Sequence, residues 1–266
     1  MKKIVFISFI FLTACRTTQV ASTNNNTTNP NITVNGKIFT TLFQQRAAEY
    51  RALCFQAYNI AKLRVDEYKS VTNKPKAIIT DIDETVLDNS PYEAFQTLQG
   101  KDYDPASWYQ WTAKGIADTM PGAASFLKYA SSKGITIFYI TNRDEKERAS
   151  TIGNLKKFQL PNADDAHFLP KQSISSKEAR RRTVSLTHEI VLLMGDNLAD
   201  FSSLFDKKTV EDRINNTDFS AGEFGNRFIV LPNPVYGDWE SSLFNYNYKL
   251  TAAQKDSVVR GALKAY

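Results

Sequence analysis

Four short runs of apolar residues, rich in β-branched and aromatic side chains, set the strongest limit on how this chain can fold. They occupy residues 77–80, 135–140, 190–194 and 228–231. Runs that are apolar at nearly every position are typical of parallel strands, which are covered on both faces. Stretches with helical periodicity separate the runs. The pattern therefore predicts an α/β fold, a doubly wound and mostly parallel sheet with its functional site at the carboxyl ends of the strands.

The chain is long enough for one catalytic domain with a small addition. It has 266 residues, of which 42% are hydrophobic, and this supports one full core over residues 36–266. Helices are predicted between the strands, at residues 122–132, 146–158, 177–185 and 200–207. A long helical stretch over 38–69 and the segment 90–120 fall outside the strand–helix alternation. We expect these two parts to form a smaller helical cap.

The N-terminus is typical of a leader segment for export. Residues 1–15 contain two lysines, an apolar run and then Leu-Thr-Ala-Cys, so that small residues directly precede Cys15. This arrangement resembles the lipobox of bacterial lipoproteins, whose cysteine carries acyl chains that together anchor stably in a membrane. The apolar run is roughly half of the ~20 residues that a membrane-spanning helix needs. We expect a lipoprotein signal peptide, the alternative being an ordinary cleaved signal peptide with an incidental Cys15.

The residues after the leader favour a tether and a place in the cell envelope. Residues 16–35 are mostly Thr, Asn, Ser and Val, a composition that cannot form a core and predicts a flexible tether. Arg16 follows the cysteine, which by analogy with lipoprotein sorting in Gram-negative cells favours the outer membrane. The formal net charge of +5 is too small to suggest a nucleic-acid partner.

Two carboxylates stand directly after the first predicted strand. Asp81 and Asp83 are two residues apart with no basic side chain between them, so they repel each other unless a cation is bound. Mg²⁺ suits such oxygen ligands and keeps several waters, which leaves room for a phosphate. A solvated acidic turn is the alternative for this pair taken alone.

Polar residues also follow the next strands and precede one of the helices. Thr141 and Asn142 close the second strand and offer a hydroxyl and an amide to a phosphate. Asp196 and Asp200 follow the third strand. Lys177 stands just before a helix, where its ammonium group could neutralise phosphate charge, although a lysine followed closely by three arginines is also typical of a solvated helix face.

The order of these groups carries a resemblance to a known family. DxDxT, a strand-end Thr, a Lys and then GDNxxD is the order found in the haloacid dehalogenase-like (HAD-like, Rossmannoid) superfamily of phosphohydrolases. Longer matches are DIDETVLDNSPY at 81–92, FYITNR at 138–143, GDNLADF at 195–201 and LPNPVYGDWE at 231–240. With them the chain resembles the class C acid phosphatases, the lipoprotein e(P4) family of 5′-nucleotidases, over residues 36–266.

The resemblance implies a role for each matching residue. Asp81 would attack phosphorus and also bind Mg²⁺, and Asp83 would bind the metal through its backbone carbonyl while its side chain serves as acid and then base. Asp196 would complete the protein ligands. The groups implied to hold phosphoryl oxygens are Thr141, Asn142 and Lys177. Asp200 would not bind the metal itself but would orient Lys177 or the metal-bound waters.

The same resemblance places Trp108 and Tyr236 as the two walls of an aromatic slot for the leaving group. Stacking there would suit nucleoside monophosphates, nicotinamide mononucleotide or aryl phosphates, and it contributes about 1–3 kcal/mol per base. From composition alone, both residues could instead belong to the core of the cap. The function that follows is an Mg²⁺-dependent acid phosphatase and 5′-nucleotidase.

Two alternatives to this function stay open at this point. One is a surface lipoprotein that binds a ligand and has only vestigial catalysis. The other is a phosphotransferase that passes the phosphoryl group to an alcohol acceptor instead of water. The sequence does not fix the oligomeric state, and a homodimer is among the alternatives.

Overall fold

The computed structural model describes residues 32–266 and has a parallel sheet at its centre. The five strands of this sheet lie in the order β5-β4-β1-β6-β7, and every pair is parallel. They are β1 (Lys76–Thr80), β4 (Thr136–Ile140), β5 (Phe168–Leu169), β6 (Glu189–Gly195) and β7 (Phe228–Val230). All four predicted strands are present, and the predicted fold class is confirmed. The additional strand β5, at the sheet edge, is too short to be recognised from an apolar run.

Helices cover both faces of the sheet. They are α2 (Ala48–Glu67), α5 (Ala123–Ser132), α6 (Arg148–Lys157) and α7 (Glu178–Thr187). Successive residues of β1 point to opposite faces: Ile78 packs in the buried cluster that includes Leu127 of α5, whereas Ala77 and Ile79 pack with Val184 of α7. The strand is therefore apolar on both sides, which is the origin of its continuous apolar run.

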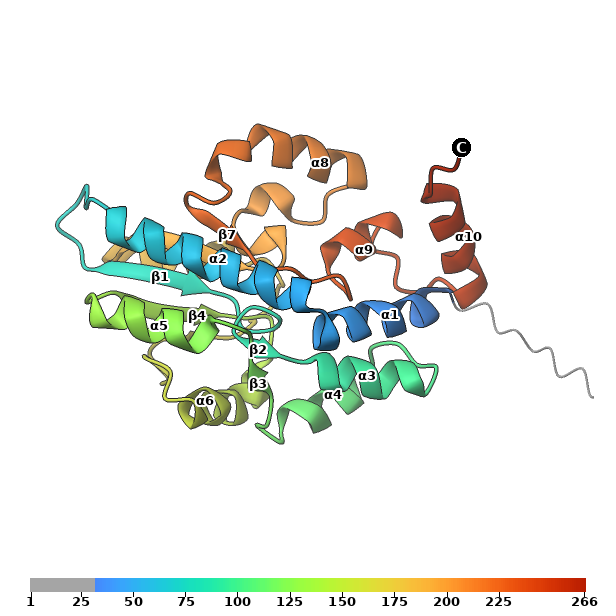
Figure 1. The fold of residues 1–266 in the computed structure, drawn as a ribbon, viewed down its shortest axis with the longest axis horizontal. Coiled ribbons are helices and arrows are strands. Elements are labelled where there is room, and N and C mark those ends of the chain that lie inside the picture. Colours follow the sequence, from blue (N-terminus) through green and yellow to red (C-terminus); the bar gives the residue numbers. More distant parts are fainter. Residues whose placement is uncertain (1–31) are drawn as a thin grey trace, which may run out of the picture.

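A second group of helices gathers beyond the carboxyl ends of the strands (Figure 1). They are α1 (Ile32–Arg46), α3 (Ser90–Leu98), α4 (Pro105–Thr112), α9 (Asp238–Leu243) and α10 (Ala252–Ala262). Helix α1 packs against α3 and α10. A two-stranded antiparallel sheet of β2 (Leu87–Asp88) and β3 (Asp118–Thr119) closes the segment that holds α3 and α4. Of the stretches predicted as a cap, α1, α3 and α4 lie in this group, whereas α2 packs against the central sheet and α5.

Two of the predicted boundaries are wrong. The helix predicted over 38–69 is two helices with Ala47 in an extended conformation between them, and the first begins at Ile32. Residues 32–35, predicted as the end of the tether, therefore belong to α1. The cause is tertiary packing, because Val34 is buried and α1 packs against α3, α10 and α2, which only the folded chain brings together.

The helix predicted over 200–207 is also wrong. Two short 3₁₀ turns, η2 (Leu198–Asp200) and η3 (Ser203–Phe205), occupy this stretch, and the α-helix α8 (Val210–Phe219) follows them. The Asp200 side chain accepts a hydrogen bond from the Asn197 N–H at 3.0 Å, which closes the first turn locally instead of continuing a helix. This turn returns the Asp200 carboxylate to the end of β6.

The leader and most of the tether lie outside the described residues, and so does Cys15. Within residues 32–266, none of the helices combines the length and the apolar character that crossing a membrane requires.

Candidate active site

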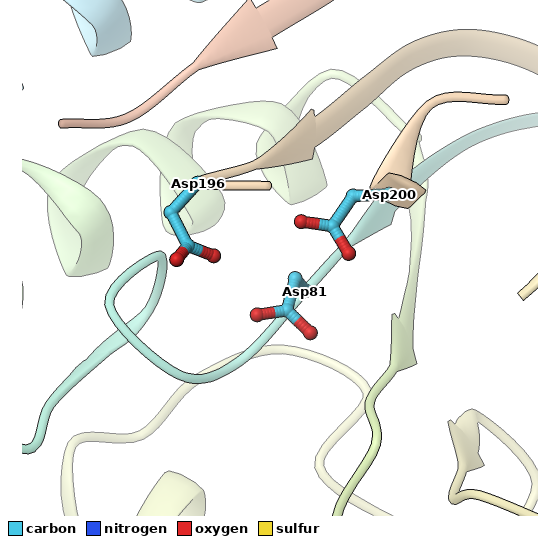
Figure 2. Close-up of side chains that lie close together, drawn as sticks. All are labelled: Asp81, Asp196 and Asp200. Atoms are coloured by element: carbon cyan, nitrogen blue, oxygen red, sulfur yellow. The ribbon is translucent and has the colours of Figure 1, made fainter. Parts of the chain in front are cut away.

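Three aspartates meet where β1 and β6 end. Asp81 follows β1, Asp196 follows β6 and Asp200 closes η2, and one carboxylate oxygen from each lies within 4.8 Å of the others. Figure 2 shows the three side chains close together at the strand ends. The Asp81 N–H donates to the Met194 carbonyl at 2.9 Å, so the pairing of the two adjacent strands continues to the first residue of the site. The sheet itself thus sets the separation between Asp81 and Asp196.

Gly195 allows the third aspartate to approach so closely. A Cβ atom at this position would overlap the Asp200 carboxylate and Cβ. The side chain of Asp200 is thereby held over the end of β6, where Asn197 also donates to it. Glycine is required here for a close approach and not for an unusual backbone conformation.

Lys177 pairs with two of these carboxylates from the start of α7. It is buried, and its ammonium group forms ion pairs with Asp81 and with Asp200, the latter at 2.6 Å. Burial alone would lower the pKa of Lys177, but the two carboxylates raise the pKa above its usual value. The lysine is therefore a permanent positive charge beside Asp81.

The acidic cluster carries more negative charge than Lys177 can balance. Burial raises the pKa of Asp81 to about 7; the Lys177 ammonium opposes the rise, while the charges of Asp200 and Asp83 add to it. Burial, followed by the charges of Asp200 and Asp81, also raises the pKa of Asp196 well above its usual range. Carboxylate oxygens this close together suit a hard divalent cation, whose charge would relieve their repulsion. The donor set therefore fits Mg²⁺.

The side chain of Asp83 is not part of this three-carboxylate cluster. Its carboxylate accepts hydrogen bonds from Arg143, with Nη2 at 2.7 Å, and from the Asn89 amide at 2.8 Å. Arg143 is itself buried, and its other terminal nitrogen donates to the Thr151 hydroxyl at 3.0 Å. The Asp83 carboxylate is therefore held by Arg143 and Asn89 and is not one of the three that lie together.

The predicted phosphate-binding residues lie around the same strand ends. The Thr141 hydroxyl accepts from the Arg143 N–H at 3.1 Å and keeps its own hydrogen for donation. The Asn142 amide oxygen accepts from Arg180 at 3.0 Å, which leaves its NH₂ group available. Asn142 and Lys177 line the large cavity at the site, whereas Thr141 is buried behind them.

The two predicted aromatic walls line this same cavity, which has a volume of about 640 Å³. The Trp108 indole N–H donates to Glu147 at 3.0 Å. The Tyr236 hydroxyl donates to Glu84, a fully buried residue in the left-handed region with φ of 54°. Each ring is thus fixed by a carboxylate on the side away from solvent. The cavity brings together the aspartates, the lysine and both aromatic side chains.

Sequence reasoning assigned no function to several residues that support the site. Glu84 and Arg143 stand inside the recognised motifs, so the motif letters could have marked them. Asn233 donates to Asp196 at 2.7 Å and also lies within a recognised segment. Asn89 likewise lies within the recognised segment 81–92, whereas Glu147 carries no periodic or motif signal that ties it to the site.

The central sheet is Rossmann-like, and a buried aspartate follows its first strand. A lysine pairs with this aspartate, and two further aspartates complete an acidic cluster that suits a cation. Together these features define the class of HAD-type phosphohydrolases. The family model described as HAD superfamily, subfamily IIIB (Acid phosphatase), matches residues 4–239. The chain belongs to this family.

Solved structures and curated relatives agree with this membership. The class C acid phosphatase from Bacillus anthracis superposes with a TM-score of 0.85 at 42% identity, covering 88% of this chain and 99% of that one. A tungstate-bound crystal structure of the same Bacillus protein also has a TM-score of 0.85 and 42% identity, with coverage of 89% and 99%.

Acid phosphatase 1 of Solanum lycopersicum is 24% identical over 166 residues, and the stem 31 kDa glycoprotein of Glycine max is 27% identical over 164 residues. The matches span 59% of this chain and 57% and 58% of those two proteins.

Proposed function

We propose that this protein is an Mg²⁺-dependent acid phosphatase that hydrolyses phosphomonoesters, 5′-nucleotides among them, through an aspartyl-phosphate on Asp81. The observation that carries the proposal is the convergence of Asp81, Asp196 and Asp200 within 4.8 Å, with the Lys177 ammonium paired to two of them. Membership in the acid phosphatase family supports the same reaction.

In the first half of the reaction Asp81 is the nucleophile. One of its carboxylate oxygens bonds to phosphorus as the ester P–O bond breaks, and the departing oxygen takes a proton from Asp83. Lys177, with Asn142 and Thr141 beside it, binds the phosphoryl oxygens and stabilises the charge that spreads over them. Asp81 and Asp196, together with either Asp200 or the Asp83 carbonyl, would hold Mg²⁺. Its positive charge would let an anionic nucleophile approach an anionic ester.

In the second half a water molecule releases the phosphate. Asp83, now ionised, takes a proton from this water as its oxygen bonds to phosphorus, and the Asp81 carboxylate leaves. Arg143 and Asn89 hold the Asp83 side chain in place for both proton transfers. Splitting one displacement into two lowers each barrier, and a positioned acid or base contributes about 10²–10⁴-fold.

The aromatic pair supports flat leaving groups such as nucleosides. Trp108 and Tyr236 both line the cavity that contains Asp81, and each ring is fixed by a hydrogen bond to a carboxylate. Rings held in this way lose little freedom when a base stacks on them. The Bacillus relative binds tungstate, an oxyanion that resembles phosphate, which agrees with an anion site of this kind.

The mechanism is tested with Asp81→Asn and with metal removal. We expect Asp81→Asn to abolish the hydrolysis of p-nitrophenyl phosphate, because the amide cannot form the covalent intermediate, and EDTA to abolish it reversibly. Asp118→Asn, at an exposed aspartate in β3, is the matched control. Trp108→Ala should reduce the turnover of AMP more than that of p-nitrophenyl phosphate. Full activity of Asp81→Asn would rule out the proposed nucleophile.

We also propose that the enzyme is anchored by lipid on Cys15, outside the described residues, to the outer membrane of a bacterial envelope. Support comes from the lipobox-like segment that ends at Cys15. A Cys15→Ser variant should move activity from the membrane fraction to the soluble fraction, or remain unprocessed. Unchanged membrane association with a mature N-terminus would contradict lipid anchoring.

A further inference from the structure

A second group of charged side chains lines the cavity away from the catalytic aspartates. Lys37 comes from α1, Glu93 from α3, Asp102 from the loop after α3, Glu240 from α9 and Lys255 from α10. We refer to these five residues as the distal charge cluster. Four different helices contribute to it, so it forms only in the folded cap region.

Within the distal charge cluster, one carboxyl group, that of Glu93, takes part in none of the ion pairs. The Lys37 ammonium lies 2.8 Å from Asp102 and 3.2 Å from Glu240, and Lys255 lies 3.2 Å from the other oxygen of Asp102. Among residues 32–266, nothing hydrogen-bonds to the Glu93 side chain or forms an ion pair with it. Glu93 is nevertheless only 6% exposed, and it lines the cavity.

An unpaired buried carboxyl group is costly unless something binds to it. Burial raises the pKa of Glu93 to about 7; Lys37 opposes the rise, and the charges of Asp102 and Glu240 add to it. In either protonation state the carboxyl group keeps oxygen atoms that can accept a hydrogen bond. A donor brought by a ligand would therefore supply what the protein itself does not.

Both walls of the aromatic slot, Trp108 and Tyr236, line the same cavity as this carboxyl group. On one side, Tyr92, the residue before Glu93, contacts Trp108 with ring centroids 5.1 Å apart. Tyr103, which follows Asp102, also lines the cavity and lies 6.1 Å from the Trp108 ring. On the other side, Glu240 lies four residues after Tyr236 in the chain, and its carboxylate pairs with Lys37 at 3.2 Å; the charges of Lys37 and Glu240 both act on Glu93.

We propose that Glu93 determines specificity by accepting a hydrogen bond from an amino group at the far edge of a flat leaving group stacked between Trp108 and Tyr236. The preferred substrates are then phosphomonoesters of amino-bearing aromatic rings, such as adenosine and cytidine 5′-monophosphates. This inference rests on the proposed phosphatase function and adds the substrate class.

The test compares AMP with purine riboside 5′-monophosphate, which lacks only the exocyclic amino group. For the wild-type enzyme we expect kcat/KM to favour AMP by about tenfold, as for a hydrogen bond between a buried carboxyl group and its donor. Glu93→Met keeps the volume but removes both oxygens, and it should bring the ratio of the two kcat/KM values close to one. Glu93→Gln keeps an acceptor oxygen and should retain a preference for AMP.

Because the ratio is taken within each variant, general damage to the enzyme cancels. Hydrolysis of p-nitrophenyl phosphate reports whether each variant is folded, and Glu211→Gln, at an exposed glutamate of α8, is the control. A ratio near one in the wild type, or an unchanged ratio in Glu93→Met, would overturn the inference. If the wild type hydrolyses none of these esters, it is the proposed phosphatase function that fails.

Discussion

The Arg143 guanidinium holds the Asp83 carboxylate through two nitrogens, with Nη2 at 2.7 Å and Nε at 3.0 Å from the same oxygen. Arg143 is buried, so this contact is shielded from water and salt. It separates Asp83 from the three aspartates that face one another. Two acids placed two residues apart in the sequence thus have different surroundings, which agrees with the different roles that we propose for them.

We expect Arg143→Lys to weaken proton transfer more than phosphoryl binding. Lysine cannot reproduce the two-nitrogen contact, so Asp83 would no longer be held beside the leaving oxygen. The turnover number for AMP, whose alkoxide needs a proton, should fall about 10²-fold. The turnover number for p-nitrophenyl phosphate should fall much less, because p-nitrophenolate leaves without protonation.

The comparison of the two esters distinguishes this role from a structural one. Arg148→Lys, at an arginine paired with exposed Glu145, is the control and should change neither value. An equal loss for both esters in Arg143→Lys would mean that the arginine supports the fold and not the acid.

Metal binding should be visible as thermal stability without any turnover. A ligand that binds only the folded state stabilises it by about 2.7 kcal/mol at a concentration of 100 Kd. Addition of Mg²⁺ to metal-free enzyme should therefore raise Tm. Asp196→Asn removes one of the mutually repelling carboxylates, so the metal-free variant should melt at a higher temperature than the metal-free wild type. Its Tm should respond weakly to Mg²⁺, and an undiminished response would contradict the assignment of Asp196 to the metal site.

Gly195→Ala tests the close approach at the end of β6. The added methyl group would overlap the Asp200 carboxylate, so Asp200 and the Lys177 ammonium paired with it must shift. We expect activity to fall at least tenfold and the free energy of unfolding to fall by about 1–3 kcal/mol. Gly153→Ala is the control, since its Cβ meets no atom within 4 Å in helix α6, and it should be neutral or slightly stabilising. Wild-type activity in Gly195→Ala would show that Asp200 can move without consequence.

The sequence was sufficient to predict the sheet and the edge of it at which the candidate site lies. Continuous apolar runs marked the strands that are buried on both faces, and parallel pairing brings the residues after each run to one edge. Asp81 and Asp196 are neighbours because β1 and β6 are neighbours. No side-chain detail was needed for this inference.

The parts that could not be predicted depend on contacts made only in the folded chain. Helix α10 buries no residue and α8 buries only Arg213, so neither has the apolar stripe that marks a helix in a sequence. The hydrogen bond from Tyr236 to Glu84 joins residues far apart in the chain. Likewise, the early start of α1 depends on helices that follow it by more than 50 residues in the sequence.

The unpaired state of Glu93 should make the stability of the protein depend on pH. Its pKa rises from 4.5 in the unfolded chain to about 7 in the folded one, so the folded state binds the proton more tightly. The resulting stabilisation is complete below pH 4.5 and is lost as the pH rises to 7. The charges of Lys37, Asp102 and Glu240 act on the same carboxyl group, and the net effect of its ionisation is on the order of 3 kcal/mol.

Glu93→Gln carries no charge at any pH and should remove this contribution. Urea unfolding of the metal-free enzyme between pH 5 and pH 8 measures it. The free energy of unfolding of the variant should exceed that of the wild type at pH 8, and the difference should shrink toward pH 5. A difference that is the same at both pH values would show that the Glu93 carboxyl group does not change its protonation in this range. In that case the carboxyl group would be ionised throughout, and the compensating charge would have to come from Lys37, which is already paired with Asp102 and Glu240.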